Sequence, residues 1–247
     1  MKLQLGLALL LLSVMPAQAQ ETADVKDQRD PFESFNRAMW YVNYNILDPV
    51  ARPVVHAYDD YMPQPVKTGF SNFFDNFDAP FSAANHLLQW KPKKAGIEVL
   101  RFTINSTVGI FGIFDIASDM GLPAHHQEEF GEVMHKYGIP SGPYLMLPLF
   151  GPTTVRDGAG DLVDGLYFPY NHLNQAQTIG RWTMDGINDR AQVRDQEPLL
   201  DNALDPYVFV REAYFQMREY DIYDGKVPEQ PQESDEWLDD YLDEIDE

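Results

Sequence analysis

The sequence predicts an all-α protein built from short amphipathic helices that Pro and Gly break frequently. Apolar residues recur at spacings of three and four in several separate segments, which is the pattern of helices with one buried face. The chain has 18 Pro and 16 Gly among 247 residues, and both residue types end or kink helices. This length suffices for one domain with a sizeable core and a tail.

The first expected helix begins near residue 32 and ends before Pro49. Its apolar residues follow a 3-4-3-4 spacing and are Phe32, Phe35, Met39, Val42 and Ile46. Asn36 and Asn43 lie seven residues apart on a different, polar stripe of this helix, and Asn45 follows closely. Asparagines on a surface helix are ordinarily solvated, so the stripe alone does not define a site.

A second helix is marked by phenylalanines at helical spacing. Val66, Phe70, Phe73 and Phe77 follow a 4-3-4 pattern, which by itself favours a core-facing stripe. Phe74 and Phe81 widen the apolar arc, as expected for a helix that lies at a membrane interface with one face on its neighbours. Both interpretations stay open. Asp78 and Pro80 predict a cap and a new helix that continues through Leu88.

An apolar segment with two glycines follows from Val108 to Phe114. Gly109 and Gly112 weaken both strand and helix, and the segment is too short to cross a bilayer. In isolation the segment could be a strand, and the alternative is a re-entrant or interfacial hairpin. In the second interpretation the hairpin acts as a membrane contact or gate and is formed by Gly109, Ile110, Phe111, Gly112, Ile113 and Phe114.

Prolines and glycines between residues 138 and 152 exclude any long regular element there. Helical spacing returns between Arg181 and Gln192 and again from Tyr207 to Met217. The expected organisation is a signal peptide at residues 1–19, a linker at 20–29, a helical body at 30–221 and an acidic tail at 222–247.

The first twenty residues carry a cationic start, a short apolar run and a small-residue exit, which is typical of a cleaved signal peptide. The formal net charge is −21, and so acidic a surface excludes nucleic acid as a partner. The chain has no Cys, which excludes thiol chemistry, disulfides and lipid attachment at a cysteine.

The tail carries nine acidic residues and no basic residue between Glu233 and Glu247. Such a block is ordinarily a disordered, solubilising terminus. However, Trp237, Leu238, Tyr241 and Leu242 would form one apolar stripe on a helix. The alternative is therefore a segment that folds on a partner with a basic rim.

The body resembles the MlaA/VacJ family of outer-membrane phospholipid-transport proteins. The resemblance covers residues 30–216 in order and rests on DPFESFNRAMWYVNYNILDPVARP from Asp30, DYMPQPVKTGFSNFFDNFDAP from Asp60, RFTINSTVGIFGIFDIA from Arg101, EEFGEVMHKYGIPSGPYLMLPLFGPTTVRDGAGDLVD from Glu128 and DPYVFVREAYFQ from Asp205.

The resemblance implies a ring of amphipathic helices in the inner leaflet of the outer membrane, with a central channel. It implies that mislocalised outer-leaflet phospholipid passes through the channel to a soluble periplasmic carrier of an inner-membrane ABC transport system. It also implies association with a trimeric porin. In this context Asn36, Asn43 and Asn45 are candidates for the channel lining, because neutral amides offer hydrogen bonds without the desolvation cost of a charge.

The sequence departs from this family in one respect, since its members are commonly lipoproteins and this chain has no Cys to acylate. We expect it at the periplasmic face of the outer membrane, held there by aromatic helices and any porin.

Two other function classes remain as alternatives. A porin-associated scaffold would bind the same membrane without moving lipid. A phospholipase would need an activated nucleophile, but no G-x-S-x-G elbow is present and Ser141 lies between prolines. His125, His126 and His135 lack the H-x-x-x-H spacing of a helical metal site, so we expect no metal, no cofactor and no catalysis.

Overall fold

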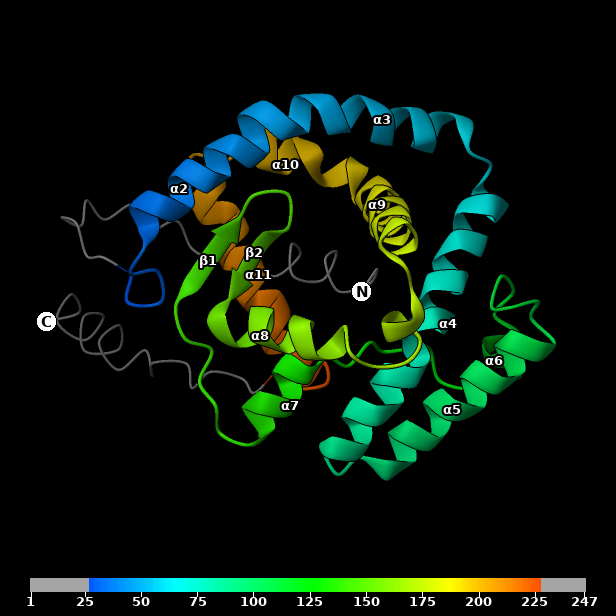
Figure 1. Ribbon diagram of the computed structural model, residues 1–247. Coiled ribbons are helices and arrows are strands. Elements are labelled where there is room, and N and C mark those ends of the chain that lie inside the picture. The colour runs from blue at the N-terminus through cyan, green and yellow to red at the C-terminus, as the bar shows by residue number, and fades with distance from the viewer. Residues whose placement is uncertain (1–26, 228–247) are drawn as a thin grey trace, which may run out of the picture.

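The computed structural model describes residues 27–227, whose helices are arranged in a ring (Figure 1). The helices, in chain order, are α2 (Glu33–Tyr41), η1 (Val42–Leu47), α3 (Asp48–Tyr61), α4 (Gln64–Leu88), α5 (Pro92–Thr107), α6 (Ile116–Asp119), α7 (Phe130–Lys136), α8 (Val155–Asp164), η2 (Tyr170–His172), α9 (Gln175–Gln192), η3 (Arg194–Gln196), α10 (Glu197–Asp201) and α11 (Pro206–Ile222). Two short strands, β1 (Tyr144–Leu147) and β2 (Gly151–Thr154), form an antiparallel pair. The signal peptide and the tail from residue 228 lie outside the described residues.

One curved helical arc, from α2 through α3, runs across the top of the ring in Figure 1. The sequence prediction that this helix ends before Pro49 is wrong. The π-helical turn η1 connects α2 to α3 without a break, and Pro49 falls in the first turn of α3. Proline is tolerated there because the first turn of an α-helix does not need its N–H group.

The longest helix, α4, descends along the right of Figure 1 and pairs with α5, which lies beside it. The predicted interruption at Asp78 and Pro80 is also wrong, because α4 continues through both residues. Pro80 removes one intrahelical hydrogen bond. Packing holds the helix on both sides of this point, since Ala79 and Phe81 are buried.

The segment in which we expected no long regular element contains the β1–β2 hairpin. Its register pairs Tyr144 with Thr154 and Leu147 with Gly151. Two asparagines on the arc hold this hairpin. The Asn36 amide donates to the Tyr144 carbonyl at 3.0 Å and accepts from the Met146 N–H at 2.9 Å. Asn43 repeats the arrangement one heptad later, at the hairpin turn, because its amide donates to the Leu147 carbonyl and accepts from the Leu149 N–H, both at 2.9 Å.

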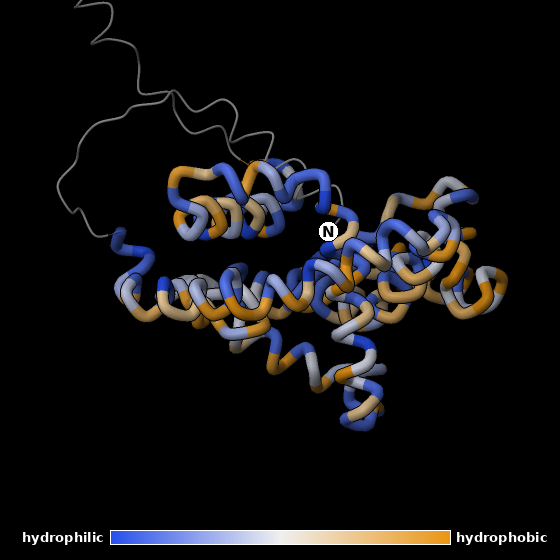
Figure 2. Tube along the Cα trace, turned by 90° about the horizontal axis from the view of Figure 1, so that it is seen from above, coloured by the Kyte–Doolittle hydropathy of each residue, from blue (hydrophilic) through white to orange (hydrophobic). Residues whose placement is uncertain are grey.

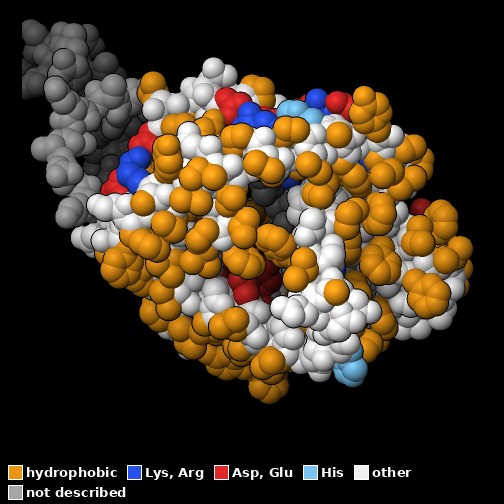
Figure 3. All heavy atoms as spheres, turned by 45° about the horizontal axis from the view of Figure 1, so that its top comes forward, with side chains coloured by type: hydrophobic (Ala, Val, Ile, Leu, Met, Phe, Trp, Pro, Cys, Tyr) orange, Lys and Arg blue, Asp and Glu red, His pale blue; other side chains and the backbone are white. Residues whose placement is uncertain are grey.

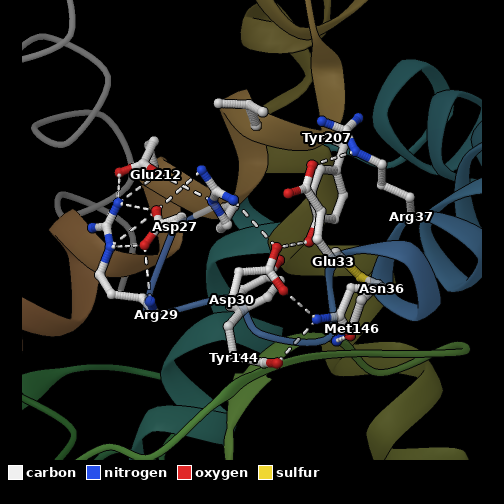
Figure 4. A network of polar contacts seen from close by, with 12 residues as sticks. Asp27, Arg29, Asp30, Glu33, Asn36, Arg37, Tyr144, Met146, Tyr207 and Glu212 are labelled. Carbon is white, nitrogen blue, oxygen red and sulfur yellow. Dashed lines mark hydrogen bonds and ion pairs between the residues drawn. The ribbon is translucent and has the colours of Figure 1, made fainter. Parts of the chain in front are cut away.

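A polar network behind this hairpin closes the ring between its N-terminal segment and α11 (Figure 4). The buried Asp30 carboxylate accepts from the Asn36 amide at 2.7 Å, from the Arg211 guanidinium at 3.2 Å and from the Tyr207 hydroxyl. At the outer end of the network, Arg29 donates to Glu212 at 2.9 Å. Segments almost two hundred residues apart in sequence are thereby joined.

The distribution of polarity is unusual for a protein in water. Among the described residues, the buried set contains more polar and charged side chains than hydrophobic ones, while large hydrophobic side chains are exposed on many elements. Hydrophobic and hydrophilic positions alternate along the helices (Figure 2). Hydrophobic side chains cover much of the face in Figure 3, around a hollow with acidic side chains deep within it. Contiguous exposed apolar surface of this kind marks contact with a membrane or a protein.

The hydrogen bonds that join Asn36 to Asp30 and to β1 yield a stability prediction. Replacing Asn36 with Ala leaves the buried Asp30 oxygen, the Tyr144 carbonyl and the Met146 N–H without their partner, and each unsatisfied buried group costs about 1 to 3 kcal/mol. The free energy of unfolding, measured by denaturant titration in detergent, should therefore fall by at least about 2 kcal/mol. Asn45→Ala is the matched control, because Asn45 is exposed on the same arc and should change stability by less than about 0.5 kcal/mol. Equal effects of the two substitutions would show that the hydrogen bonds of Asn36 do not stabilise the fold.

Candidate functional site

A cavity with a mostly apolar wall lies inside the ring, between the arc, the β-hairpin turn and α9. Its volume is about 510 Å³. The residues that line it are Trp40, Asn43, Tyr44, Leu47, Asp48, Ala51, Val55, Met146, Leu149, Gly151, Pro152, Trp182, Thr183, Gly186, Ile187, Arg190, Leu200 and Val210. We call it the central cavity.

The three candidate channel asparagines have three different environments. Asn36 is 0% exposed and holds β1, so it does not line an open channel in this structure. Asn43 lies on the wall of the central cavity, where its amide also holds the hairpin turn. Asn45 is exposed and is not among the residues that line this cavity. Asn36 and Asn43 thus share a polar stripe on the arc, and in this structure both side chains bind the β1–β2 hairpin.

The sequence analysis missed most of the cavity wall. The arc contributes Trp40, Tyr44, Leu47, Ala51 and Val55, which follow helical spacing on a neighbouring face of the same helix. Trp182, Gly186 and Arg190 follow the same spacing on α9. Each stripe was visible in the sequence, but only the packing of α9 against the arc brings the two together.

Charged groups at one end of the central cavity form a paired network. The Arg190 guanidinium contacts the Asp48 carboxylate, which also accepts from Arg52 at 2.9 Å. Arg52 in turn donates to Asp201 at 2.8 Å, and Asp201 accepts from the Tyr44 hydroxyl at 2.7 Å. The network joins α3, α9 and α10, and it places cationic and acidic groups beside an otherwise apolar wall.

A second cavity of about 520 Å³ lies on the other face of α9, towards α3 and α4, and has a polar lining. Lys67 and Arg194 line it, and both cations are paired with Asp59, at 2.6 and 3.0 Å. Asn188 also lines it and donates to the Ser71 hydroxyl at 2.9 Å. The helix α9 therefore separates an apolar space from a polar one.

The phenylalanines of the proposed interfacial helix lie on α4. Phe74 is buried, whereas Phe70, Phe73 and Phe77 are half-buried. Phe74 and Phe77 lie beneath the Arg181 guanidinium, with its carbon 5.6 and 5.4 Å from the two ring centres. These two rings contact protein, so they are at least partly core residues.

A buried ion pair holds α9 to α4 next to these rings. Arg181 donates to both carboxylate oxygens of Asp78, at 2.7 and 3.0 Å, and the Tyr170 hydroxyl donates to the same carboxylate. Burial raises the pKa of Asp78 to about 6, and the neighbouring Arg181 opposes this shift. The pair fixes the wall that α9 presents to the central cavity.

A second buried cluster joins α7 and α8 to α11. Arg218 donates to Glu129 at 2.7 Å and to Asp157 at 3.2 Å. Asp164 accepts from the Phe130 N–H at 2.8 Å, and burial raises its pKa to about 6. A carboxyl with a raised pKa contributes stability that is fully present below its unfolded pKa, near 4, and is lost as the pH rises through 6.

The proposed gate hairpin is an ordered turn between α5 and α6. Ile110, Phe111, Ile113 and Phe114 are 55%, 74%, 42% and 54% exposed. The turn is closed by backbone hydrogen bonds from Gly112 to Asn105 at 2.8 Å and from Phe114 to Gly109 at 2.9 Å.

Close packing explains both glycines of this hairpin. A Cβ at Gly112, which has φ of +91°, would lie 2.4 Å from the Cβ of Asn76. A Cβ at Gly109 would lie 2.2 Å from the Phe114 carbonyl oxygen. Ile110 and Phe111 also have positive φ, of 53° and 56°, although such residues rarely adopt this conformation.

The other residues considered for chemistry have structural partners. His125 contacts Glu98 at 2.7 Å, and His135 lies 3.3 Å from Arg156. Within residues 27–227, no three His, Asp or Glu side chains are grouped as a metal site would need. In the same range, no helix combines the length and hydropathy required to cross a bilayer.

Comparison with known proteins gives consistent matches. The family model described as MlaA lipoprotein matches residues 28–221. The intermembrane phospholipid transport system lipoprotein MlaA of Escherichia coli (strain K12) is 38% identical over 250 residues, covering 100% of this chain and 99% of that protein. The protein of the same name from Haemophilus influenzae is 36% identical over 235 residues, covering 93% and 92%.

A solved structure is also similar. It comes from work on the structural basis for maintenance of bacterial outer membrane lipid asymmetry, with a TM-score of 0.74 and 41% identity. The match covers 78% of this chain and 98% of the solved chain.

The exposed hairpin yields the second prediction. Phe111→Asp together with Phe114→Asp should weaken binding of the purified protein to phospholipid vesicles, because each buried Phe contributes about 1.5 to 3 kcal/mol. Since 1.4 kcal/mol corresponds to a factor of ten, vesicle affinity should fall at least about tenfold for each Phe that enters the bilayer. The unfolding midpoint should stay unchanged, because both rings are exposed. Phe111→Leu with Phe114→Leu keeps apolar side chains and is the control. Unchanged vesicle affinity would show that the hairpin does not enter lipid, and a general loss of stability would show instead that the two rings pack within the protein.

Proposed function

This chain belongs to the MlaA lipoprotein family, and we propose that it transports phospholipid and maintains the lipid asymmetry of the outer membrane. In this proposal it takes mislocalised phospholipid from the outer leaflet and passes it towards the periplasm. Relatives at 38% and 36% identity bear the name of an intermembrane phospholipid transport system lipoprotein, and this supports the substrate class.

The proposal rests on the distribution of polarity in the ring, in which large hydrophobic side chains are exposed while many polar and charged side chains are buried. Exposed apolar side chains on the arc, on α5 and on the hairpin, such as Val50, Val99 and Phe111, suit an environment of acyl chains. The central cavity combines an apolar wall with the charged network at Arg190 and Asp48. A phospholipid has the same two chemistries, so the cavity can accept its chains and its headgroup together.

The remaining partners are part of the proposal. We place the ring at the periplasmic face of the outer membrane, next to a trimeric porin, and we assign the receiving end to a soluble periplasmic carrier. The chain has no Cys, so its membrane contact in this proposal comes from the apolar surface and the porin. A scaffold that binds the same porin without moving lipid is the competing hypothesis, and a phospholipase is the third.

Two glycines of α9 offer a matched test of transport. Gly186 lies on the wall of the central cavity, whereas Gly180 does not, and a Cβ at either position would meet nothing within 4 Å. Gly186→Trp should fill the cavity and reduce phospholipid transfer to the level of protein-free controls. Gly180→Trp should leave transfer unchanged. The measurement is the movement of labelled phospholipid from vesicles carrying protein and porin to a periplasmic carrier.

Each competing hypothesis predicts a different result. A scaffold predicts that wild-type protein transfers no more lipid than the protein-free control. A phospholipase predicts release of free fatty acid, which the same samples report by mass spectrometry. Equal transfer by the two tryptophan variants would remove the central cavity from the lipid path.

The part of the acidic tail from residue 228 onwards lies outside the described residues, and we propose that it docks the carrier through Trp237, Leu238, Tyr241 and Leu242. Long-range attraction of its acidic residues to a basic rim would speed encounter. Truncation after Pro231 should leave folding and membrane association intact and should reduce carrier affinity at low salt. The loss should shrink as salt rises, since the Debye length falls from about 8 Å at physiological ionic strength to about 3 Å at 1 M. Equal affinities of full-length and truncated protein across the titration would leave the tail as a solubilising terminus.

A further inference from the structure

We propose that the space between α10, α11 and β2 is a pocket for one acyl chain, and that a phospholipid in transit lies with this chain inside and its polar end at Arg190. The inference rests on the proposed function and adds the position of the lipid. We call this space the side pocket. Its volume is about 260 Å³.

The side pocket lies next to the central cavity. Both spaces are bounded by Pro152, Arg190, Leu200 and Val210. The two spaces therefore share a wall, and in this proposal a phospholipid that occupies both crosses it at these residues.

Apolar side chains form most of the inner wall of the side pocket. Phe209, Ala213 and Met217 come from successive turns of α11, and Val193 faces them from the end of α9. An apolar wall of this kind favours hydrocarbon over water, because water finds too few polar partners there. An acyl chain meets this requirement, whereas a headgroup or a polar metabolite does not.

The polar groups of the side pocket are Arg190, Gln196 and Glu197. Each has one buried side-chain atom without a hydrogen-bond partner: Nε of Arg190, Oε1 of Gln196 and Oε1 of Glu197. Buried polar atoms are seldom left without partners. The unpartnered atoms of Gln196 and Glu197 are acceptors, which phosphate oxygens do not satisfy, and neither residue lines the central cavity. Arg190 lines both spaces, so its unpartnered Nε–H is the donor that a phosphate between them would meet. The polar end of a phospholipid is rich in oxygen acceptors, and the Arg190 guanidinium is a donor that pairs well with phosphate.

The proposal therefore gives the bound lipid a single orientation. One acyl chain occupies the side pocket along α11, the glycerophosphate lies near Arg190, and the second chain stays in the central cavity against Trp182. The side pocket is the smaller of the two spaces, which matches it to one chain rather than to the whole lipid.

The experiment uses site-specific photo-crosslinking in the full-length protein, in membranes that contain porin and carrier. A photo-reactive phenylalanine analogue replaces Phe209 in the side pocket, Trp182 in the central cavity or Ala176 on the exposed start of α9. Phospholipid adducts are identified by mass spectrometry, and fragmentation locates the bond within the lipid. We expect an acyl-chain adduct at position 209 at least several-fold above the adduct at position 176.

Three results would separate the hypotheses. Adducts at 182 but only control levels at 209 would overturn the side pocket and leave the proposed transport standing. Control levels at both 182 and 209 would overturn the proposed transport as well. An adduct at 209 bonded through the headgroup would reverse the proposed orientation and so contradict it.

A blocking variant supplies the second arm. Ala213→Phe should fill the side pocket and abolish the adduct at position 209, while the adduct at 182 persists. Ala57→Phe, on the exposed side of α3, is the size-matched control and should change neither adduct. An unchanged adduct at 209 in the Ala213→Phe protein would show that the chain lies elsewhere.

Discussion

The structure depends on the side-chain amides of Asn36 and Asn43, which bind the β-hairpin to the inside of the helical arc. A ring of helices has no single central core, so its far parts must be joined by specific contacts. Amides suit this task because one side chain can donate and accept at once. The hairpin that they hold then provides part of the central cavity and a surface for α11.

Ion pairs with buried partners also join segments that are far apart in the sequence. Asp30 with Arg211, Asp78 with Arg181 and Asp157 with Arg218 are ion pairs with at least one partner well buried. Burying one charge alone is costly, and breaking such a pair is strongly destabilising. Many large hydrophobic side chains are exposed rather than buried in this fold, so buried ion pairs and hydrogen bonds specify many of the contacts between its segments.

The sequence predicted the class of the fold and the positions of several elements, but not the continuity of its helices. Helical spacing located the arc, α4 and α11, and the two glycines located the hairpin before α6. The breaks expected at Pro49 and Pro80 do not occur, because a π-turn accommodates the first and flanking packing holds the second. Local rules treat proline as a terminator, whereas tertiary packing decides whether the helix resumes.

The cavity was harder to predict for a related reason. Spacing showed that Asn36 and Asn43 share a stripe, yet a polar stripe suits a channel wall, solvent or a docked hairpin equally well. Only the position of β1 decides among these, and that contact spans more than a hundred residues of sequence. The wall contributed by Trp182 and Arg190 depends in the same way on how α9 packs, and the ion pair between Arg181 and Asp78 settles that packing.

The hairpin between α5 and α6 stores backbone strain at its most exposed point. Ile110 and Phe111 both have positive φ, a conformation that costs on the order of 1 to 3 kcal/mol for each such residue. The hydrogen bonds across the turn and the close approach of Gly112 to Asn76 hold it in this shape. The tip is thus a preformed wedge, and its conformational entropy is already lost when the protein folds. In the proposed membrane contact, entry of this tip into a bilayer would require no further ordering of the chain, so nearly all of the gain from transferring these side chains into hydrocarbon would remain available for adhesion.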